Sequence, residues 1–322
     1  MRTHTRNRSF GLVLALAIVI GGCTSTAAPA TPPVTPTSPP AAATTAPPTA
    51  APTAIPVPPT ATPEPPTATP TPNALPPEPV PIDFEAEDGQ ELHGLYYPAA
   101  VENAALVVLM HWVAADQRDW TEIAFWLQNR GLGGQSQKTR PWLDPSWFPP
   151  MLEGQSFAVF TFSFRGCGED GCDDWLPGEW LLDAQAAMNA ASQLDGIDPQ
   201  RVVSIGASIG ADGAAHGCAF LNAEDGAGQC RGTLSLSPGN YLIAPYAAAV
   251  KPLQAEQPPK PVWCFYAEGD RESAPTCKAE SGDAFRAVEF PGDSHGMMLV
   301  RPEVEPKTLE LMLDFFKTAL GL

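Results

Sequence analysis

From residue 81 onward, short apolar runs alternate with longer amphipathic stretches. Runs rich in β-branched and aromatic residues predict strands at 105–110, 157–162, 201–205, 233–236, 262–266 and 285–290. Apolar residues at helical spacing predict helices at 119–129, 178–194 and 304–320. Strands that are apolar throughout are typical of a parallel sheet buried on both faces. The pattern therefore predicts an α/β fold with a mostly parallel central sheet and helices on both faces.

A hairpin is predicted at the start of this region. Residues 82–87 and 91–98 have strand-like composition and flank Asp88-Gly89, a strong turn signal. An antiparallel hairpin would therefore open an otherwise parallel sheet.

The first 22 residues have the pattern of a bacterial signal peptide. Arg2, Arg6 and Arg8 precede an apolar run at 11–20, which is too short to cross a bilayer comfortably. The run ends in Ile20-Gly21-Gly22-Cys23, which resembles a lipobox. The resemblance implies cleavage before Cys23, lipidation of that residue, and a lipid-anchored protein outside the cytoplasm in the cell envelope. An ordinary secretory peptide with a chance cysteine is the alternative.

Residues 23–80 are predicted to be a disordered linker. Residues 24–80 hold 20 of the 38 prolines of the chain, with Thr and Ala at most other positions. Such a segment cannot bury enough apolar surface to fold. Residues 81–322 remain, a length that suits one α/β domain. The net charge of −18 disfavours nucleic acid and anionic lipid surfaces as partners, so contact with a membrane is expected through the lipid anchor only.

Cysteine usage agrees with export. Besides Cys23, the chain has six cysteines, an even number that suggests disulfides. Pairing sequence neighbours gives the shortest loops, and the expected pairs are Cys167 with Cys172, Cys218 with Cys230, and Cys264 with Cys277. A zinc site is the alternative, but no C-x₂-C pair is present. No metal or cofactor is expected.

The most informative motif is Gly206-Ala207-Ser208-Ile209-Gly210, between the predicted strand at 201–205 and a predicted helix of small residues that follows it. G-x-S-x-G in this context places a serine on a strained strand-to-helix turn. Here the chain resembles the α/β-hydrolase family. The short connection between Leu236 and Val262 has room for a turn and one short helix. We therefore expect an α/β-hydrolase fold without a cap domain, similar to the dienelactone hydrolases.

The resemblance implies a catalytic triad in the order Ser, acid, His. Ser208 is the expected nucleophile. Asp270 follows the predicted strand at 262–266 where the family has its acid, and Glu268 is the competing carboxylate. His295 follows the predicted strand at 285–290 and is the expected base. All three follow the carboxyl ends of strands, so they are expected at one edge of the sheet.

An oxyanion hole is expected from backbone N–H groups. Ile209, directly after the nucleophile, supplies one donor. By resemblance the second is Val113, with Trp112 where the family usually has glycine, which leaves the identity of this donor open. His111, at the start of this loop, and the Arg165-Gly166-Cys167-Gly168 turn have structural roles in similar proteins. Trp175 and Trp180 either line the pocket or simply pack.

The long connection at 131–155 carries Trp142, Trp147 and Phe148. It joins the end of a helix to the start of a strand, so we expect it at the edge of the sheet opposite the nucleophile. Its aromatic residues are expected to pack locally or on the outer helices. An active-site lid is the alternative, because loops of this length are often functional.

The sequence therefore predicts a serine hydrolase that cleaves small esters or related acyl bonds. A hydrolase fold without catalysis, acting as a ligand-binding or adhesion module, is the alternative. A nucleotide-binding fold is disfavoured because the chain lacks G-x-G-x-x-G and a Walker lysine. The oligomeric state is left open.

Overall fold

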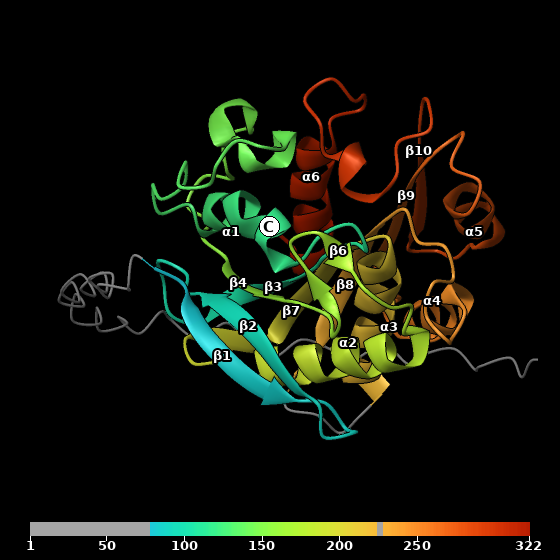
Figure 1. The fold of residues 1–322 in the computed structure, drawn as a ribbon, viewed down its shortest axis with the longest axis horizontal. Coiled ribbons are helices and arrows are strands. Elements are labelled where there is room, and N and C mark those ends of the chain that lie inside the picture. The colour runs from blue at the N-terminus through green and yellow to red at the C-terminus, as the bar shows by residue number, and fades with distance from the viewer. Residues whose placement is uncertain (1–77, 224–227) are drawn as a thin grey trace, which may run out of the picture. The chain divides into compact units, whose positions relative to one another are not determined.

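Eight strands form one sheet in the order β1-β2-β4-β3-β7-β8-β9-β10 within residues 78–223 and 228–322, the part of the chain that the computed structural model describes (Figure 1). Their bounds are β1 Val80–Glu85, β2 Glu91–Tyr97, β3 Ala104–Met110, β4 Ala158–Phe162, β7 Ile197–Ala207, β8 Cys230–Leu236, β9 Val262–Ala267 and β10 Phe285–Phe290. Strand β2 is antiparallel to both of its neighbours, β1 and β4, and the remaining strands β4, β3, β7, β8, β9 and β10 run parallel to one another. The predicted hairpin and parallel sheet are both confirmed.

Helices cover both faces of this sheet (Figure 1). Their bounds are α1 Thr121–Gln128, α2 Pro177–Ala191, α3 Ile209–Ala223, α4 Tyr246–Ala255, α5 Ser273–Ala279 and α6 Thr308–Leu320. Alternate residues of β3 point to opposite faces: Val108 packs in the core with α2, α3, α4 and α5, and Val107 packs in the core with α1 and α6. This arrangement confirms the predicted layers.

Some boundaries differ from the sequence prediction. Helix α6 begins at Thr308 rather than at residue 304, because Pro306 restricts the residue before it and offers no N–H to a helix. Helix α5 was not expected. Helix α4 is the one short helix expected between Leu236 and Val262, and the described residues include no cap domain in this connection.

The expectation for the 131–155 connection was wrong in part. Glu122, in the first turn of α1, accepts hydrogen bonds from the N–H groups of Gly134 (2.6 Å) and Ser136 (2.7 Å). These bonds bring the connection back along α1 toward the carboxyl edge of the sheet, where Trp142 contacts Trp112 with ring centroids 5.7 Å apart. The chain here is long enough to reverse its direction, which its two end points alone do not reveal.

The other two aromatic residues of this connection pack locally, as expected. The Trp147 and Phe148 rings lie 4.9 Å apart, and Phe148 also contacts Trp126 of α1 at 5.9 Å. The indole of Trp126 donates a hydrogen bond to the carbonyl of Pro149 at 2.7 Å.

All six cysteines among the described residues form disulfides in the expected pairs: Cys167–Cys172, Cys218–Cys230 and Cys264–Cys277. The first joins β5 (Cys167–Gly168) to β6 (Gly171–Cys172), two short strands that pair antiparallel. We call residues 166–174, which contain these strands, the disulfide ribbon.

The predicted signal peptide at 1–22, the predicted lipidation site Cys23 and the predicted linker as far as residue 77 lie outside the described residues. Strand β1 begins at Val80, one residue before the expected start of the domain. Within the described part of the chain, no helix is long and apolar enough to span a membrane.

Candidate active site

Ser208 occupies the tight turn between strand β7 and helix α3. Its backbone φ is +54°, in the left-handed region that residues other than glycine seldom adopt. Its N–H donates to the carbonyl of Leu236 in β8 at 2.8 Å, which fixes the turn against the next strand. Ser208 is only 2% exposed. The turn therefore holds the hydroxyl in a fixed, largely desolvated position at the carboxyl edge of the sheet.

The flanking glycines are required by close backbone approach. A Cβ atom at Gly206 would lie 1.8 Å from the carbonyl oxygen of Gly210. At Gly210 it would lie 2.4 Å from the carbonyl oxygens of Met110 and His111. The G-x-S-x-G spacing thus has a direct structural cause in this chain.

Ser208, His295 and Asp270 form one hydrogen-bonded chain. His295 Nε2 lies 2.9 Å from Ser208 Oγ, and His295 Nδ1 lies 2.7 Å from Asp270 Oδ2. Asp270 follows β9 and His295 follows β10, so strands adjacent in the sheet deliver the two side chains. The structure brings together the three residues that the sequence selected.

The surroundings of Asp270 keep its carboxyl ionised. Burial raises its pKa, but hydrogen bonds from His295 and Ser273 outweigh burial and lower the pKa to about 2. Its Oδ1 also accepts the N–H groups of Glu272 and Ser273, both at 3.2 Å. An ionised carboxylate only accepts hydrogen bonds, so His295 Nδ1–H donates to it and Nε2 is left to accept the Ser208 hydroxyl proton.

Glu268, the competing carboxylate, lies elsewhere. It is exposed, and its Oε1 accepts the N–H of Gly292 at 3.4 Å. Asp270, not Glu268, hydrogen bonds to His295.

The three backbone N–H groups expected to form the oxyanion hole have no partner among the described residues. Within residues 78–223 and 228–322, no hydrogen bond uses the N–H of Trp112, Val113 or Ile209. The disulfide ribbon holds the loop that carries Val113, because the Val113 carbonyl accepts a hydrogen bond from the N–H of Cys172 at 3.0 Å. The disulfide ribbon therefore packs directly on the expected oxyanion loop.

Trp112 belongs to a cluster that sequence reasoning missed. Its indole donates to Asp119 Oδ2 at 2.7 Å, and Arg140 donates to the same oxygen at 2.7 Å. A Cβ at Gly296, whose φ is +56°, would lie 3.0 Å from the indole of Trp112. The indole therefore packs between the 131–155 connection and the residue after His295. Trp112 was expected only as a residue of the oxyanion loop, in the place of the family's glycine, and nothing in the sequence pairs its indole with Asp119.

His111 has the structural role expected of it. It is fully buried, and burial lowers its pKa to about 4, so the ring is neutral. Its Nε2 accepts the N–H of Phe164 at 2.9 Å, and its Nδ1–H donates to the Trp112 carbonyl at 2.8 Å. The ring thereby links the loop after β3 to the segment after β4.

Arg165 is structural as well. It donates to Asp183 from Nε at 2.8 Å and from Nη2 at 2.6 Å, and it also pairs with Asp88 at the hairpin turn. The indole of Trp180 donates to the Arg165 carbonyl at 3.0 Å. Trp180 is fully buried, so it packs rather than lining a site.

Tyr241, on the loop after β8, is a second feature that was missed. Its ring lies edge-on to His295 with centroids 5.9 Å apart. The buried carboxylate of Asp212 holds this loop by accepting the N–H of Tyr241 at 2.6 Å. Asp212 lies one helical turn after Ser208, which is a recognisable signal, but its partner in a distant loop is not.

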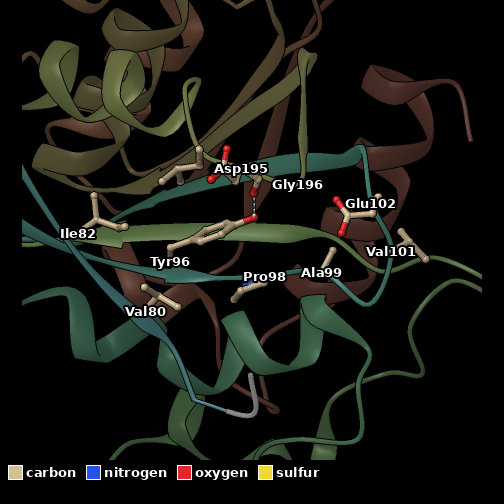
Figure 2. A pocket seen from close by; sticks show the side chains of 10 residues that line it. Val80, Ile82, Tyr96, Pro98, Ala99, Val101, Glu102, Asp195 and Gly196 are labelled. Atoms are coloured by element: carbon tan, nitrogen blue, oxygen red, sulfur yellow. Dashed lines mark hydrogen bonds between the residues drawn. The ribbon is translucent and has the colours of Figure 1, made fainter. Parts of the chain in front are cut away.

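The described residues also line cavities outside this site, of which two are of note. The first, of about 370 Å³, is lined by Val80, Tyr96, Val101 and Asp195 among others (Figure 2). Asp195 precedes β7 and Ser208 follows it, so this cavity is at the opposite edge of the sheet. The second, of about 500 Å³, lies beyond the oxyanion loop between Ala115 and Arg140.

A group of possible metal ligands lies on the hairpin. Asp83, Glu91 and His93 place ligand atoms within 4.8 Å of one another, and all three residues are exposed. His93 is on β2 and takes no part in the Ser208 site.

No known family profile matches the chain. The uncharacterized protein YfhR of Escherichia coli K12 is 28% identical over 131 residues, which cover 40% of this chain and 38% of YfhR. The match with this curated relative therefore spans well under half of its length.

The fold is similar to solved structures at low sequence identity. The Pyrococcus furiosus esterase Pf2001 aligns with a TM-score of 0.51 and 15% identity, over 76% of this chain and 94% of that one. A Pyrobaculum calidifontis esterase aligns with a TM-score of 0.53 and 15% identity, over 76% and 87%. A 2,6-dihydroxy-pseudo-oxynicotine hydrolase aligns with a TM-score of 0.51 and 12% identity, over 76% and 69%. These likenesses establish the α/β-hydrolase fold.

Proposed function

Given the α/β-hydrolase fold of this chain, we propose that the protein is a serine hydrolase that cleaves esters or related acyl bonds through an acyl-enzyme on Ser208. The observation that carries the proposal is the continuous hydrogen-bonded chain from Ser208 Oγ through His295 to Asp270. Serine is a poor nucleophile at neutral pH and needs an adjacent base, which in turn needs a group to orient it. The arrangement supplies both.

In the proposed reaction, Ser208 Oγ attacks the substrate carbonyl while His295 Nε2 takes its proton. The N–H groups of Ile209 and Val113 stabilise the oxyanion, and Asp270 stabilises the charged imidazole. His295 then returns the proton to the leaving alcohol. Water, activated by the same histidine, hydrolyses the acyl-enzyme and frees Ser208.

Esters are the first substrates to test, because the two archaeal structural relatives are described as esterases. The purified full-length chain is expected to hydrolyse short activated aryl esters with kcat/KM well above the background rate. Chromogenic assay against a panel of esters, thioesters and amides would rank the bond types. A correctly folded chain that turns over none of them would favour the ligand-binding alternative.

We further propose that the protein is lipid-anchored in a bacterial cell envelope through Cys23. The support is the sequence pattern at residues 1–23 together with the three disulfides of the folded region, which agree with an oxidising compartment. Cys23→Ser is expected to block lipidation and to move the protein from the membrane to the soluble fraction, as followed by immunoblot. Membrane retention of this variant equal to that of the wild type would show that the anchor lies elsewhere.

A further inference from the structure

An exposed apolar surface lies beside the Ser208 site. Trp175 is 55% exposed and Ile243 is 71% exposed, and both rank among the few large hydrophobic residues that the described chain leaves open to solvent. Tyr241 lies between Trp175 and His295. We call Trp175 and Tyr241 the aromatic surface; Ile243 follows Tyr241 on the same loop.

Packing fixes this surface in place. The Trp175 ring lies 5.1 Å from the buried Trp180 and 6.1 Å from Tyr241, both edge to face, and Tyr241 lies 5.9 Å from His295. The N–H of Ile243 donates to the Pro177 carbonyl at 3.1 Å, which ties its loop to the start of α2. The aromatic surface is therefore continuous with the catalytic array rather than a separate patch.

The surface is bordered by acidic residues. Residues 166–179 contain no Lys or Arg, and their exposed acids are Glu169, Asp170, Asp173, Asp174 and Glu179. The N–H of Cys172 binds the Val113 carbonyl and that of Asp173 binds the Gly166 carbonyl, so this acidic segment lies against the oxyanion loop.

The arginines around this segment are already paired. Arg118 donates to Asp116 and to Glu169, and Arg165 is held by Asp88 and Asp183. Asp173 and Asp174, which immediately precede Trp175, therefore act on an approaching substrate with little local compensation.

We propose that the aromatic surface binds a cationic, amine-bearing part of the ester substrate, next to the bond that Ser208 attacks. This inference rests on the proposed hydrolase function and adds the substrate class. Indole and phenol faces attract ammonium groups, and a surrounding negative potential raises the local concentration of cations. A neutral group of the same shape gains the apolar contact alone, and an anionic group is repelled.

The test compares two isosteric esters on the full-length chain: a choline ester and the 3,3-dimethylbutyl ester of the same acid. The expected kcat/KM ratio is about tenfold in favour of the choline ester, as one cation–π contact with partial desolvation provides. Trp175→Leu, which keeps the apolar contact and removes the indole face, is expected to bring the ratio to about twofold or less.

Charge variants distinguish the effect of the acidic residues next to Trp175 on the choline preference from the effect of the net charge of the chain. Asp173→Asn with Asp174→Asn is expected to lower the choline preference, and added salt is expected to reproduce that loss in the wild type. The matched control is Glu310→Gln with Asp314→Asn, the same change of charge on α6 at the opposite face of the sheet, which should leave the ratio unchanged. An equal fall in both pairs would overturn the proposed local effect.

Failure of the subsite and failure of the hydrolase function give different results. Equal kcat/KM for the two esters in an active wild type would overturn the subsite and leave the function intact. If neither ester is hydrolysed, calorimetric titration of Ser208→Ala with the choline ester measures binding alone. Binding that is abolished when Trp175→Leu is added to Ser208→Ala supports the subsite, and an absence of binding to Ser208→Ala overturns it.

Discussion

Ser208→Ala is expected to lower kcat/KM for a small activated ester by about 10⁶, because it removes the atom that forms the acyl-enzyme. His295→Ala is expected to cost about as much, and the double variant no more than either alone, since members of a triad act as a unit. Steady-state hydrolysis by the purified full-length variants measures all three. Thermal unfolding of each variant serves as the control for folding.

The most informative comparison in this experiment is that between the loss in the double variant and the losses in the two single variants. If the two single losses multiplied in the double variant, Ser208 and His295 would be acting independently and the hydrogen bond between them at 2.9 Å would have no catalytic meaning. Undiminished activity in Ser208→Ala would place the nucleophile elsewhere.

Asp270→Asn is expected to reduce kcat by about 10⁴ while the fold is kept. The amide can donate to His295 Nδ1 and so favour the wrong tautomer, and it cannot balance the charge of the imidazolium. The carboxylate form is the one present at neutral pH, because hydrogen bonds from His295 and Ser273 prevail over burial and hold the pKa of Asp270 at about 2.

Glu268→Gln is the matched control for Asp270→Asn. It makes the same chemical change two residues earlier in the same loop, but Glu268 is exposed and hydrogen bonds to the Gly292 N–H instead of His295. Its kcat is expected to stay within about threefold of wild type, an activation free-energy change of about 0.6 kcal/mol, because Glu268 has no hydrogen bond to Ser208, His295 or Asp270. A large loss in Glu268→Gln with an active Asp270→Asn would move the acid to Glu268.

Much of the arrangement could be predicted from local signals. Asp88-Gly89 predicted the hairpin, apolar runs predicted the strands, and G-x-S-x-G predicted the turn at Ser208. Each of these signals lies within a short stretch of the chain, so it can be recognised without knowledge of distant contacts. The carboxyl ends of β9 and β10 then brought Asp270 and His295 to the same edge of the sheet as Ser208.

The features that sequence reasoning missed depend on contacts between distant segments. The 131–155 connection returns to the carboxyl edge because Glu122 binds two of its N–H groups, and Trp142 then reaches Trp112. Tyr241 faces His295 because Asp212 holds its loop from inside α3. Neither contact has a periodic or compositional signal, so both became visible only in three dimensions.

The central claim is that Ser208 is an activated nucleophile. The most direct measurement is intact-protein and peptide mass spectrometry after the full-length chain has reacted with a fluorophosphonate. One phosphonyl group per chain is expected, located on Ser208, absent from Ser208→Ala and formed far more slowly in His295→Ala. An unmodified Ser208 in the folded protein, or a label that persists in Ser208→Ala, would contradict this claim.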